Sequence, residues 1–500
     1  MKLFILSAGL FAAGLANASL AGIKREQVLV SNCLSNKNVP TQWKNSSEYN
    51  TLAEPFNTRL VYEPYAIVLP ETNQHVQDAV ACAAECGIKV QAKSGGHSYA
   101  SFSSGGKDGS LMIFLQAFNN VTLNQETGIV SVGGGVRLGN LANGIYDQGK
   151  RALPHGTCPG VGVGGHATHG GYGHVSREYG LALDTIVGLD IVLANGSLVH
   201  ATETEYADVY WACRGACDSI GIVTKFEMQT HAAPESITYF DFEYSTGIYK
   251  DKDTYIETFL HIQDVALNTT VVDERISWGI YENGSLYKIG GAFHGTIDDF
   301  KATVVPEFLR TLPTPNVINI TSYSWIDYLK LVSDRNAIIE PLTGYDEHDD
   351  FFAKSITVPE KDGFTAAALG AKYDYITTGK VPSFFVITNL YGGPGSAINE
   401  KDTEFAAYRD RDSLWVLQLY GNKPGNTSLP FINGLTAAIT GAQPQTEFGA
   451  YLNYVDPSLS ADEAHKLYYG EELYGELQKV KEEVDPDEVF WNPQAVVVSA

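Results

Sequence analysis

Short apolar runs alternate with a helical segment between about residues 62 and 234. Residues 73–86 form a predicted helix, and Thr72 stands before them as an N-cap residue. A strand and a helix followed by further strands predict an α+β domain. The apolar and β-branched runs that predict strands lie at 66–69, 90–93, 111–115, 130–132, 187–193 and 220–228.

The pattern changes after about residue 236. Residues 239–244 alternate apolar and polar side chains, as expected of a strand with one apolar face. Further strands at 384–390 and 414–420, mixed with helical segments, predict a second domain with its own sheet. The tail returns to a helix, because Ser460 and Glu463 form a capping-box pattern. That helix is predicted to run to about residue 484, before the proline at 486.

The composition is that of a folded and strongly acidic protein. The chain has 500 residues, of which 34 are basic and 58 acidic, so its formal net charge is −24. Apolar residues make up 44% and charged residues 18%, which excludes wholesale disorder and leaves enough chain for a large core. Nucleic acids and anionic membranes require a basic surface, so we expect neither as a partner.

The first residues have the features of a secretory signal peptide. Lys2 precedes an apolar stretch at 3–15 that is too short to span a bilayer, and Ala16-Asn17-Ala18 offers a cleavage site. The alternative is a buried N-terminal helix. Seven N-x-S/T sequons support export, so we expect a secreted, extracellular glycoprotein. The sequon asparagines are Asn45, Asn120, Asn195, Asn268, Asn283, Asn319 and Asn426.

Six cysteines fit an oxidising compartment in which disulfides persist. We expect Cys33 and Cys82 to pair, which would tie the N-terminal arm to the first helix. Cys213 and Cys217 either pair or remain buried thiols. Cys158 differs from the others, because it lies in a glycine-rich loop whose backbone can approach another group closely.

Glycine is concentrated between residues 94 and 174, which contain 20 of the 49 glycines and five of the 12 histidines. Two pieces stand out, Ser94-Gly95-Gly96-His97-Ser98-Tyr99 and the run HGTCPGVGVGGH from His155 to His166. Glycine lets backbone N–H groups approach a phosphate or an aromatic ring. The cluster is not a P-loop, because no Gly-Lys-Ser/Thr follows, and it lacks the dinucleotide-binding fingerprint between a strand and a helix.

These two pieces resemble the flavin-attachment segments of the berberine-bridge-enzyme-like flavoproteins, which have the vanillyl-alcohol-oxidase fold. The resemblance extends from about Phe56 to the C-terminus. It implies an FAD that is bound covalently twice, with His97 joined to the flavin 8α-methyl group and Cys158 to flavin C6. The alternatives are a locally bonded loop histidine and a disulfide or buried thiol. If Cys158 holds flavin, five cysteines remain, and Cys86 is the candidate for the unpaired one.

The resemblance also implies the domain organisation. After a signal peptide at 1–18, a PCMH-type FAD-binding domain would comprise residues 19–235 and the C-terminal return, 451–500. The insertion between them, 236–450, would be an α+β substrate domain built on an antiparallel sheet. The fold class is therefore predicted as α+β, and we expect a monomer.

Further residues are implied to line the cofactor. Val161 matches a gate position where a small aliphatic side chain lets oxygen reach the flavin, which favours O2 as the electron acceptor. The stretch 214–220 departs from the more glycine-rich pattern of the family, so the local contacts there are open. No metal ligands are predicted. The implied cofactor-binding residues besides His97 and Cys158 are Gly95, Gly96, Ser98, Val161, Gly164, Gly165, His166, Tyr172, Gly221 and Val223.

Tyr454 and Tyr99 are the predicted catalytic residues. Tyr454 lies in Asn453-Tyr454-Val455-Asp456, and the resemblance implies that it takes the proton of the substrate hydroxyl. A phenol has a pKa of about 10, so a neighbouring cation, hydrogen bonds or the field of the flavin must favour its charged form. The alternative is a structural tyrosine. Tyr99 follows His97 by two positions, so on an extended segment both side chains point the same way. It would flank the sugar, tune Tyr454 or simply pack.

The chain resembles gluco- and chito-oligosaccharide oxidases within the family. This implies oxidation of the anomeric C1 hydroxyl of reducing-end cello-, chito- or xylo-oligosaccharides to the lactone, with O2 reduced to H2O2. The predicted substrate residues are Asn389, Tyr391 and Gln418, although Asn389 stands where these oxidases tend to carry an acid. Tyr281, Trp325 and Phe385 either stack on pyranose rings or belong to the core, as most aromatic residues at strand spacing do.

Two other functions stay open. A related flavoprotein oxidase or dehydrogenase would act on a secondary metabolite or pass electrons to a quinone-type acceptor. A non-enzymatic alternative is a secreted sugar-binding protein that uses its tyrosines for stacking. Peroxide release on addition of oligosaccharides separates the first from the favoured function, and flavin that stays bound after denaturation excludes the second.

Overall fold

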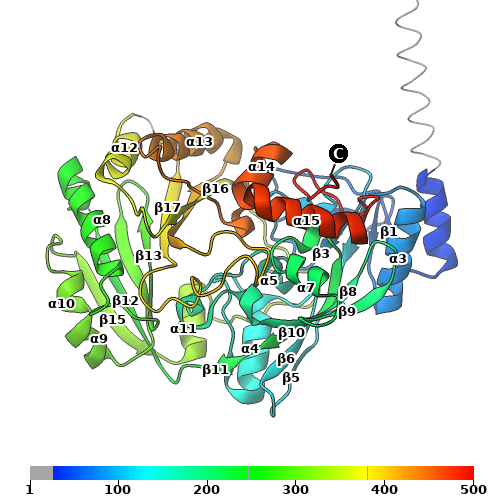
Figure 1. Ribbon diagram of the computed structural model, residues 1–500, viewed down its shortest axis with the longest axis horizontal. Coiled ribbons are helices and arrows are strands. Elements are labelled where there is room, and N and C mark those ends of the chain that lie inside the picture. Colours follow the sequence, from blue (N-terminus) through cyan, green and yellow to red (C-terminus); the bar gives the residue numbers. More distant parts are fainter. Residues whose placement is uncertain (1–25, 246, 380, 500) are drawn as a thin grey trace, which may run out of the picture.

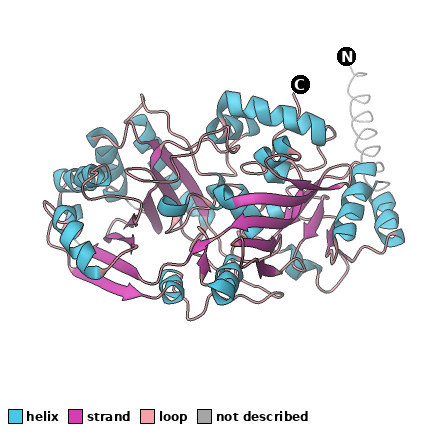
Figure 2. Ribbon diagram, turned by 60° about the horizontal axis from the view of Figure 1, so that its bottom comes forward, coloured by secondary structure: helices cyan, strands magenta, loops and turns pink. Residues whose placement is uncertain are grey.

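Three main sheets organise the computed structural model, which describes residues 26–245, 247–379 and 381–499. The predicted signal peptide at 1–18 lies outside these residues. In Figure 1, helices of the middle of the chain lie at the left and those of the C-terminal tail lie over the right-hand half. Figure 2 shows most helices at the periphery and most strands toward the middle.

The first sheet mixes parallel and antiparallel pairs. β1 is antiparallel to β2, whereas β2, β4 and β3 run parallel to their neighbours. Helix α3 packs its apolar face on these strands, and its N-cap Thr72 accepts a hydrogen bond from the N–H of His75, as predicted. The elements are β1 Thr41–Trp43, α2 Tyr49–Ala53, β2 Ala66–Val68, α3 Asn73–Glu85, β3 Val90–Lys93 and β4 Leu111–Phe114.

A disulfide between Cys33 and Cys82 joins helical residues 26–36 to α3, with the two Cα atoms 5.7 Å apart. This confirms the predicted pair. Cys158 is a free thiol, which excludes the disulfide alternative for that residue. Cys213 and Cys217 are buried and not bonded to each other in this structure.

The second sheet is antiparallel throughout, in the order β5-β6-β10-β8-β9. Its apolar face forms one core with helices α4, α5 and α7. The strands are β5 Val121–Leu123, β6 Ile129–Gly133, β8 Ile186–Val192, β9 Leu198–Ala201 and β10 Ile222–Gln229, and the short strands β7 Arg151–Ala152 and β11 His231–Ala232 pair beside them. The helices are α4 Leu138–Gly149, α5 Val163–Thr168, α6 Ser176–Tyr179 and α7 Ala207–Ala212.

The third sheet has seven antiparallel strands in the order β15-β12-β14-β13-β17-β18-β16. On β12 the apolar residues Phe240, Phe242 and Tyr244 are buried, as the alternating pattern predicts. They form a second core with helices α8, α12 and α13. The strands are β12 Ile237–Tyr244, β13 Ile276–Glu282, β14 Tyr287–Phe293, β15 Val317–Tyr323, β16 Phe352–Pro359, β17 Phe384–Leu390 and β18 Ser413–Gly421. The helices are α8 Lys252–Ala266, α9 Ile297–Thr303, α10 Val305–Phe308, α11 Trp325–Val332, α12 Ala366–Thr377 and α13 Gly425–Gly441.

The C-terminal tail packs back against the core of the second sheet through α14 (Ala461–Tyr468) and α15 (Gly470–Val484). The capping box at Ser460 is confirmed, but the prediction of one helix to residue 484 is wrong. Gly470 has φ +72°, a left-handed conformation that favours glycine and ends the regular helix between the two segments. Figure 1 shows both helices, in red, over the strands of the N-terminal half.

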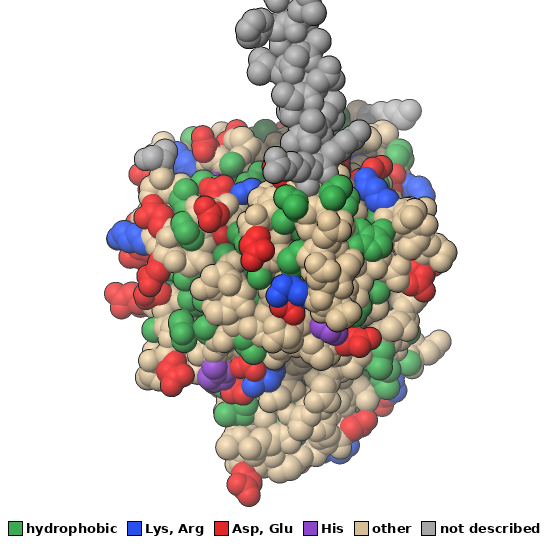
Figure 3. All heavy atoms as spheres, turned by 90° about the vertical axis from the view of Figure 1, so that its right-hand side faces the viewer, with side chains coloured by type: hydrophobic (Ala, Val, Ile, Leu, Met, Phe, Trp, Pro, Cys, Tyr) green, Lys and Arg blue, Asp and Glu red, His purple; other side chains and the backbone are tan. Residues whose placement is uncertain are grey.

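The surface agrees with the acidic composition. On the face drawn in Figure 3, outside the grey residues, acidic side chains are scattered and no basic patch gathers. Within the described ranges, no helix combines the length and the apolar character that a membrane span requires.

Candidate active site

A cavity of about 960 Å³ lies between the second and third sheets and is closed on one side by the C-terminal tail. Its lining residues come from the first two sheets and their loops, from the third sheet and from the C-terminal tail. Every predicted site residue except Tyr391 is among them, so folding brings together positions that are more than 350 residues apart in the sequence. These lining residues are Gly95, Gly96, His97, Ser98, Tyr99, Cys158, Val161, Gly164, Gly165, His166, Tyr172, Gly221, Val223, Asn389, Gln418 and Tyr454.

The two glycine-rich loops touch each other directly at one wall of the cavity. A Cβ atom added to Gly95 would lie 2.2 Å from the backbone nitrogen of Gly162, closer than any side chain permits. Arg137 locks the contact, because its guanidinium donates to the carbonyl oxygen of Gly95 at 2.9 Å and also to that of Gly160. Residues without side chains at this crossing therefore bring the attachment residues of both loops to one place.

Replacing Gly95 with alanine should separate the loops and reduce flavin incorporation. The added methyl group can only be accommodated by a backbone shift, so we expect the free energy of unfolding to fall by about 1–3 kcal/mol. Absorbance at the flavin bands and a denaturant titration measure both effects. Gly475→Ala is the matched control, because nothing lies within 4 Å of a Cβ at that helical position. Equal flavin content in both variants would contradict the argument.

His97 is a neutral imidazole, and a hydrogen bond fixes the orientation of its ring. Burial lowers its pKa to about 3, and Arg137 adds to this effect. Its Nε2 atom lies 2.9 Å from the hydroxyl of Tyr345, which in turn donates to Glu347. Among the described residues no group hydrogen-bonds Nδ1, so one ring nitrogen with a free lone pair remains. This is what attachment to an electrophilic carbon requires.

Cys158 presents an accessible sulfur to the same cavity. The surrounding protein raises the pKa of its thiol, and the carboxylate of Glu347 raises it further, whereas Arg335 opposes this. The resting side chain is therefore a thiol, and a thiolate must form during the attachment reaction.

Tyr454 ends the short helix η5 (Leu452–Tyr454) and faces the cavity. Among the described residues no group hydrogen-bonds its hydroxyl, which leaves that oxygen available to a ligand. Burial raises the pKa of Tyr454 well above 10, and Tyr99 and Tyr451 raise it further. A neighbouring cation was one of the expected means of favouring the charged form of this phenol. The side chains that shift its pKa most include no cation.

Tyr99 lies directly beside the predicted base. The two rings stack, with centroids 5.5 Å apart and planes 14° apart. The hydroxyl of Tyr99 accepts a hydrogen bond from Gln418 Nε2 at 2.7 Å, and the side chain is partly buried. Tyr99 therefore links Tyr454 to the strand β18 of the third sheet.

Two contacts fix the segment that carries Tyr454. Asn453 Nδ2 donates to the carbonyl oxygens of His166 and His169, each at 3.1 Å, which ties the segment to the second glycine-rich loop. On the other side, Lys354 Nζ of β16 lies 2.7 Å from a carboxylate oxygen of Asp456, in an ion pair without hydrogen-bond geometry. Side-chain exposure is 15% for the lysine and 3% for the aspartate, so water screens the pair poorly.

Replacing Lys354 with methionine should leave the Asp456 carboxylate buried and unpaired. We expect a loss of about 3–5 kcal/mol in the free energy of unfolding. A small displacement of Tyr454 would also lower kcat by about 10- to 100-fold with little change in KM. Lys44→Met is the control, because its partner Glu63 is 70% exposed, and we expect an unchanged Tm there. A Lys354 variant with wild-type kcat would show that the pair does not position Tyr454.

The wall opposite the glycine loops comes from the third sheet. Asn389 on β17 lies opposite Gly279 in the strand register and faces the cavity, as does Gln418 on β18. Tyr281 and Phe385 also line it and stack on each other, with ring centroids 5.6 Å apart.

The prediction for Tyr391 on this wall is wrong, and the structure decides between the two alternatives for Trp325. Tyr391 is only 1% exposed and does not reach the cavity, because its ring stacks behind Tyr172 at 4.1 Å. Trp325 is 2% exposed and belongs to a separate apolar cluster with Tyr328. Both aromatic side chains are core residues, as the alternative for Trp325 stated.

The residues present fit a flavin dinucleotide. The loops approach through glycine, the imidazole is neutral with a free nitrogen, and the thiol is accessible. In addition, two residues that line the cavity, Ser103 and Gln494, each have a buried side-chain oxygen without a hydrogen-bond partner.

Sequence reasoning missed the residues that support this site. Tyr345, Arg137 and Lys354 come from three different parts of the chain, and nothing in their neighbourhood marks them. Asn453 and Asp456 belong to the motif that contains Tyr454, so the sequence could have identified them as supporting residues.

Known proteins match nearly the whole length of this chain. A family model described as "FAD binding domain" matches residues 64–202, and one described as "Berberine and berberine like" matches residues 450–497. A xylooligosaccharide oxidase of Thermothelomyces thermophilus is 38% identical over 94% of this chain and 95% of its own length. A carbohydrate oxidase of Microdochium nivale is 38% identical over 98% and 99%, and a chitooligosaccharide oxidase of Gibberella zeae is 35% identical over 96% of each chain.

Solved structures agree. The xylooligosaccharide oxidase from Myceliophthora thermophila, in complex with xylobiose, has a TM-score of 0.88 at 37% identity and covers 94% of this chain and 100% of its own. A glucooligosaccharide oxidase from Acremonium strictum with a 6-S-cysteinyl, 8α-N1-histidyl FAD has a TM-score of 0.88 at 32% identity, over 94% and 100%. The predicted α+β fold with its FAD-binding domain is confirmed. The chain therefore belongs to the berberine-bridge-enzyme-like family of FAD-dependent oxidoreductases.

Proposed function

We propose that this protein is a secreted oligosaccharide oxidase that converts the anomeric C1 hydroxyl of a reducing-end sugar to the lactone and produces H2O2. The observation that carries the proposal is the position of Tyr454. Its free hydroxyl faces a cavity that has two attachment residues on one wall and hydrogen-bonding side chains on the other. The relatives that match nearly full length are oxidases of xylo-, chito- and gluco-oligosaccharides.

His97 and Cys158 hold the cofactor in this proposal. The free Nδ1 of His97 and the accessible sulfur of Cys158 lie on the two glycine-rich loops, which Arg137 binds together. These two residues would hold the flavin at two points in the cavity that Tyr454 also lines. When bound, FAD supplies the redox chemistry, because it takes the hydride from C1 and passes electrons to O2.

Tyr454 acts on the proton at O1 of the sugar. Removal of that proton makes the loss of hydride from C1 favourable, and general base catalysis of this kind contributes about 10²–10⁴-fold. The protein side chains alone keep the phenol protonated, since burial raises its pKa. Bound cofactor and substrate must therefore favour the phenolate, and Tyr99 holds the ring in place for this step.

Asn389 and Gln418 bind the sugar, and the stacked rings of Tyr281 and Phe385 contact the next pyranose along the cavity. Asn389 is an amide and donates as well as accepts hydrogen bonds, so it suits a neutral, hydroxyl-rich ligand. Val161 lines the cavity beside Cys158 and leaves room for O2 at the attachment end. The acidic surface suits a neutral substrate.

The predicted domain boundaries and the monomeric state belong to this proposal. The third sheet begins at Ile237 and its last strand ends at Gly421, in keeping with an inserted substrate domain at 236–450. Secretion is supported by the disulfide between Cys33 and Cys82, which persists in an oxidising compartment.

A substrate screen with peroxide detection tests the proposal. Cello-, chito- and xylo-oligosaccharides and their monosaccharides are added to the flavin-loaded enzyme under air, and H2O2 and the aldonic acid are quantified. We expect stoichiometric peroxide and acid with at least one of them. Flavin reduction by sugar without peroxide would indicate a dehydrogenase. No reduction by any reducing sugar would contradict the proposal and favour a secondary-metabolite substrate.

A further inference from the structure

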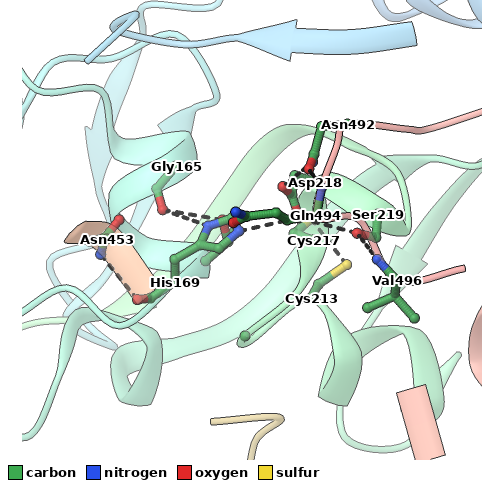
Figure 4. A network of polar contacts seen from close by, with 12 residues as sticks. Gly165, His169, Cys213, Cys217, Asp218, Ser219, Asn453, Asn492, Gln494 and Val496 are labelled. Atoms are coloured by element: carbon green, nitrogen blue, oxygen red, sulfur yellow. Dashed lines mark hydrogen bonds and ion pairs between the residues drawn. The ribbon is translucent and has the colours of Figure 1, made fainter. Parts of the chain in front are cut away.

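Two thiols lie in contact in the wall of the cavity. Cys213 is the C-cap residue of α7, and Cys217 opens the short helix η3 (Cys217–Ser219). Their sulfur atoms are 3.1 Å apart, and the residues are 0% and 3% exposed. Figure 4 shows the two cysteines close together near Asp218.

The pair has the geometry of a dithiol that can close. An S–S bond is about 2.05 Å long, so the two sulfurs need to approach by only about 1 Å. The one other hydrogen bond of either sulfur among the described residues is a long one, from Cys217 Sγ to the carbonyl oxygen of Gly221 at 3.9 Å. No strong hydrogen bond therefore has to be broken.

Cys217 is the member that meets the cavity, whereas Cys213 is enclosed in the core behind it. Cys217 is therefore the thiol that a small oxidant formed in this cavity would meet first. The reaction of the proposed function releases H2O2 in this cavity, which provides that oxidant.

We propose that Cys213 and Cys217 are an oxidation site, at which peroxide from the enzyme's own turnover forms a second disulfide. The source of the oxidant rests on the proposed function. In the first step, the Cys217 thiolate attacks one peroxide oxygen, the O–O bond breaks, and a sulfenic acid and one water form. The Cys213 thiolate then attacks the Cys217 sulfur, and the second oxygen leaves as water. In total, two thiols and one H2O2 give one disulfide and two waters.

The surrounding contacts explain what the bridge would stabilise. Asp218 follows Cys217 directly, and its carboxylate contacts His169 at 3.3 Å and accepts from Asn492 at 2.8 Å. Ser219 accepts from the backbone N–H of Val496 at 3.0 Å. Figure 4 shows these residues as one network. A bridge at 213–217 would fasten this network to α7, and it would protect Cys217 from irreversible oxidation by excess peroxide.

The reaction is expected to be slow relative to turnover. The hydrogen bond with Cys213 and burial raise the pKa of the Cys217 thiol well above its usual value, so little thiolate is present at neutral pH. The disulfide therefore accumulates slowly, over many catalytic cycles.

Thiol labelling of the holoenzyme tests the proposal. With Cys33 and Cys82 paired and Cys158 on the flavin, thiols remain only at Cys86, Cys213 and Cys217. Enzyme treated with a mild reductant is exposed to H2O2 without sugar, denatured, alkylated and digested. We expect two of the three thiols to disappear and one peptide to lose the mass of two hydrogens between Cys213 and Cys217. A bridge already present in the secreted enzyme, and re-formed after reduction, would support the proposal equally.

A second arm adds sugar and air, with and without catalase. A bridge that forms with added H2O2, but not during turnover that releases measured H2O2, would overturn the enzyme's own turnover as the source of the oxidant. If no H2O2 is released with sugar, the proposed function fails and the oxidation site stands on the added-peroxide result. Three alkylated thiols after peroxide treatment, or sulfinic acid at Cys217 without a bridge, would overturn the oxidation site itself. Cys217→Ser should keep both remaining thiols under peroxide, and Cys213→Ser serves if that variant does not fold. Cys86→Ser is the matched control and should lose both of its thiols.

Discussion

Replacing Tyr454 with phenylalanine should lower kcat by about 10²–10⁴-fold while the flavin remains attached. The change removes one oxygen atom, the atom that faces the cavity without a protein partner, and keeps the ring that stacks on Tyr99. Rapid mixing with sugar under anaerobic conditions measures flavin reduction directly. Because burial raises the pKa of Tyr454, the wild-type rate of reduction should increase with pH, and the variant should lose that dependence.

Tyr146→Phe is the control for this substitution, since Tyr146 lies on α4 and does not line the cavity. It should leave kcat, flavin content and Tm unchanged. If the Tyr454 variant reduces its flavin at the wild-type rate, another group takes the proton, and the assignment of the base is wrong.

Replacing His97 and Cys158 together with alanine should abolish covalent flavin. Each single variant retains one bond, so precipitation with acid should leave the yellow colour on the protein in both single variants and release it in the double variant. We expect Cys158→Ala, which keeps only the His97 bond, to oxidise sugar more slowly. Absorbance of the supernatant and the mass of the intact protein measure the result.

Cys86→Ala is the control for the cysteine substitution, because Cys86 is half-buried at the end of α3 and away from the cavity. It should keep both bonds to flavin. Complete release of flavin from Cys158→Ala alone would show that His97 is not an attachment residue.

Much of the local structure could be predicted from the sequence. The strand at 384–390 and the N-cap at Thr72 follow from side-chain pattern and from one hydroxyl, both of which act within a few residues. The pairing of Cys33 with Cys82 was also predicted correctly. The break at Gly470 was missed, because the pattern of apolar positions continues across it while the backbone does not.

The candidate site was predictable where chemistry is concentrated in one motif. The two glycine-rich pieces and the tyrosine motif contain His97, Cys158 and Tyr454, and all three side chains meet in one cavity. Tyr391 was placed wrongly, because a strand pattern does not reveal that the residue after β17 turns away and packs on Tyr172. Tyr345 was missed, since its only connection to His97 is a contact across 248 positions.

The sequence by itself determined the chemistry that this protein can perform. The glycine-rich pieces that contain His97 and Cys158 resemble the flavin-attachment segments of the family, and that resemblance implies a doubly attached flavin. The tertiary structure alone decided how that chemistry is controlled. The neutral state of His97 and the buried pair of Lys354 with Asp456 depend on burial and on distances between separate elements. Electrostatic energies change steeply with both, and neither is encoded in a local pattern.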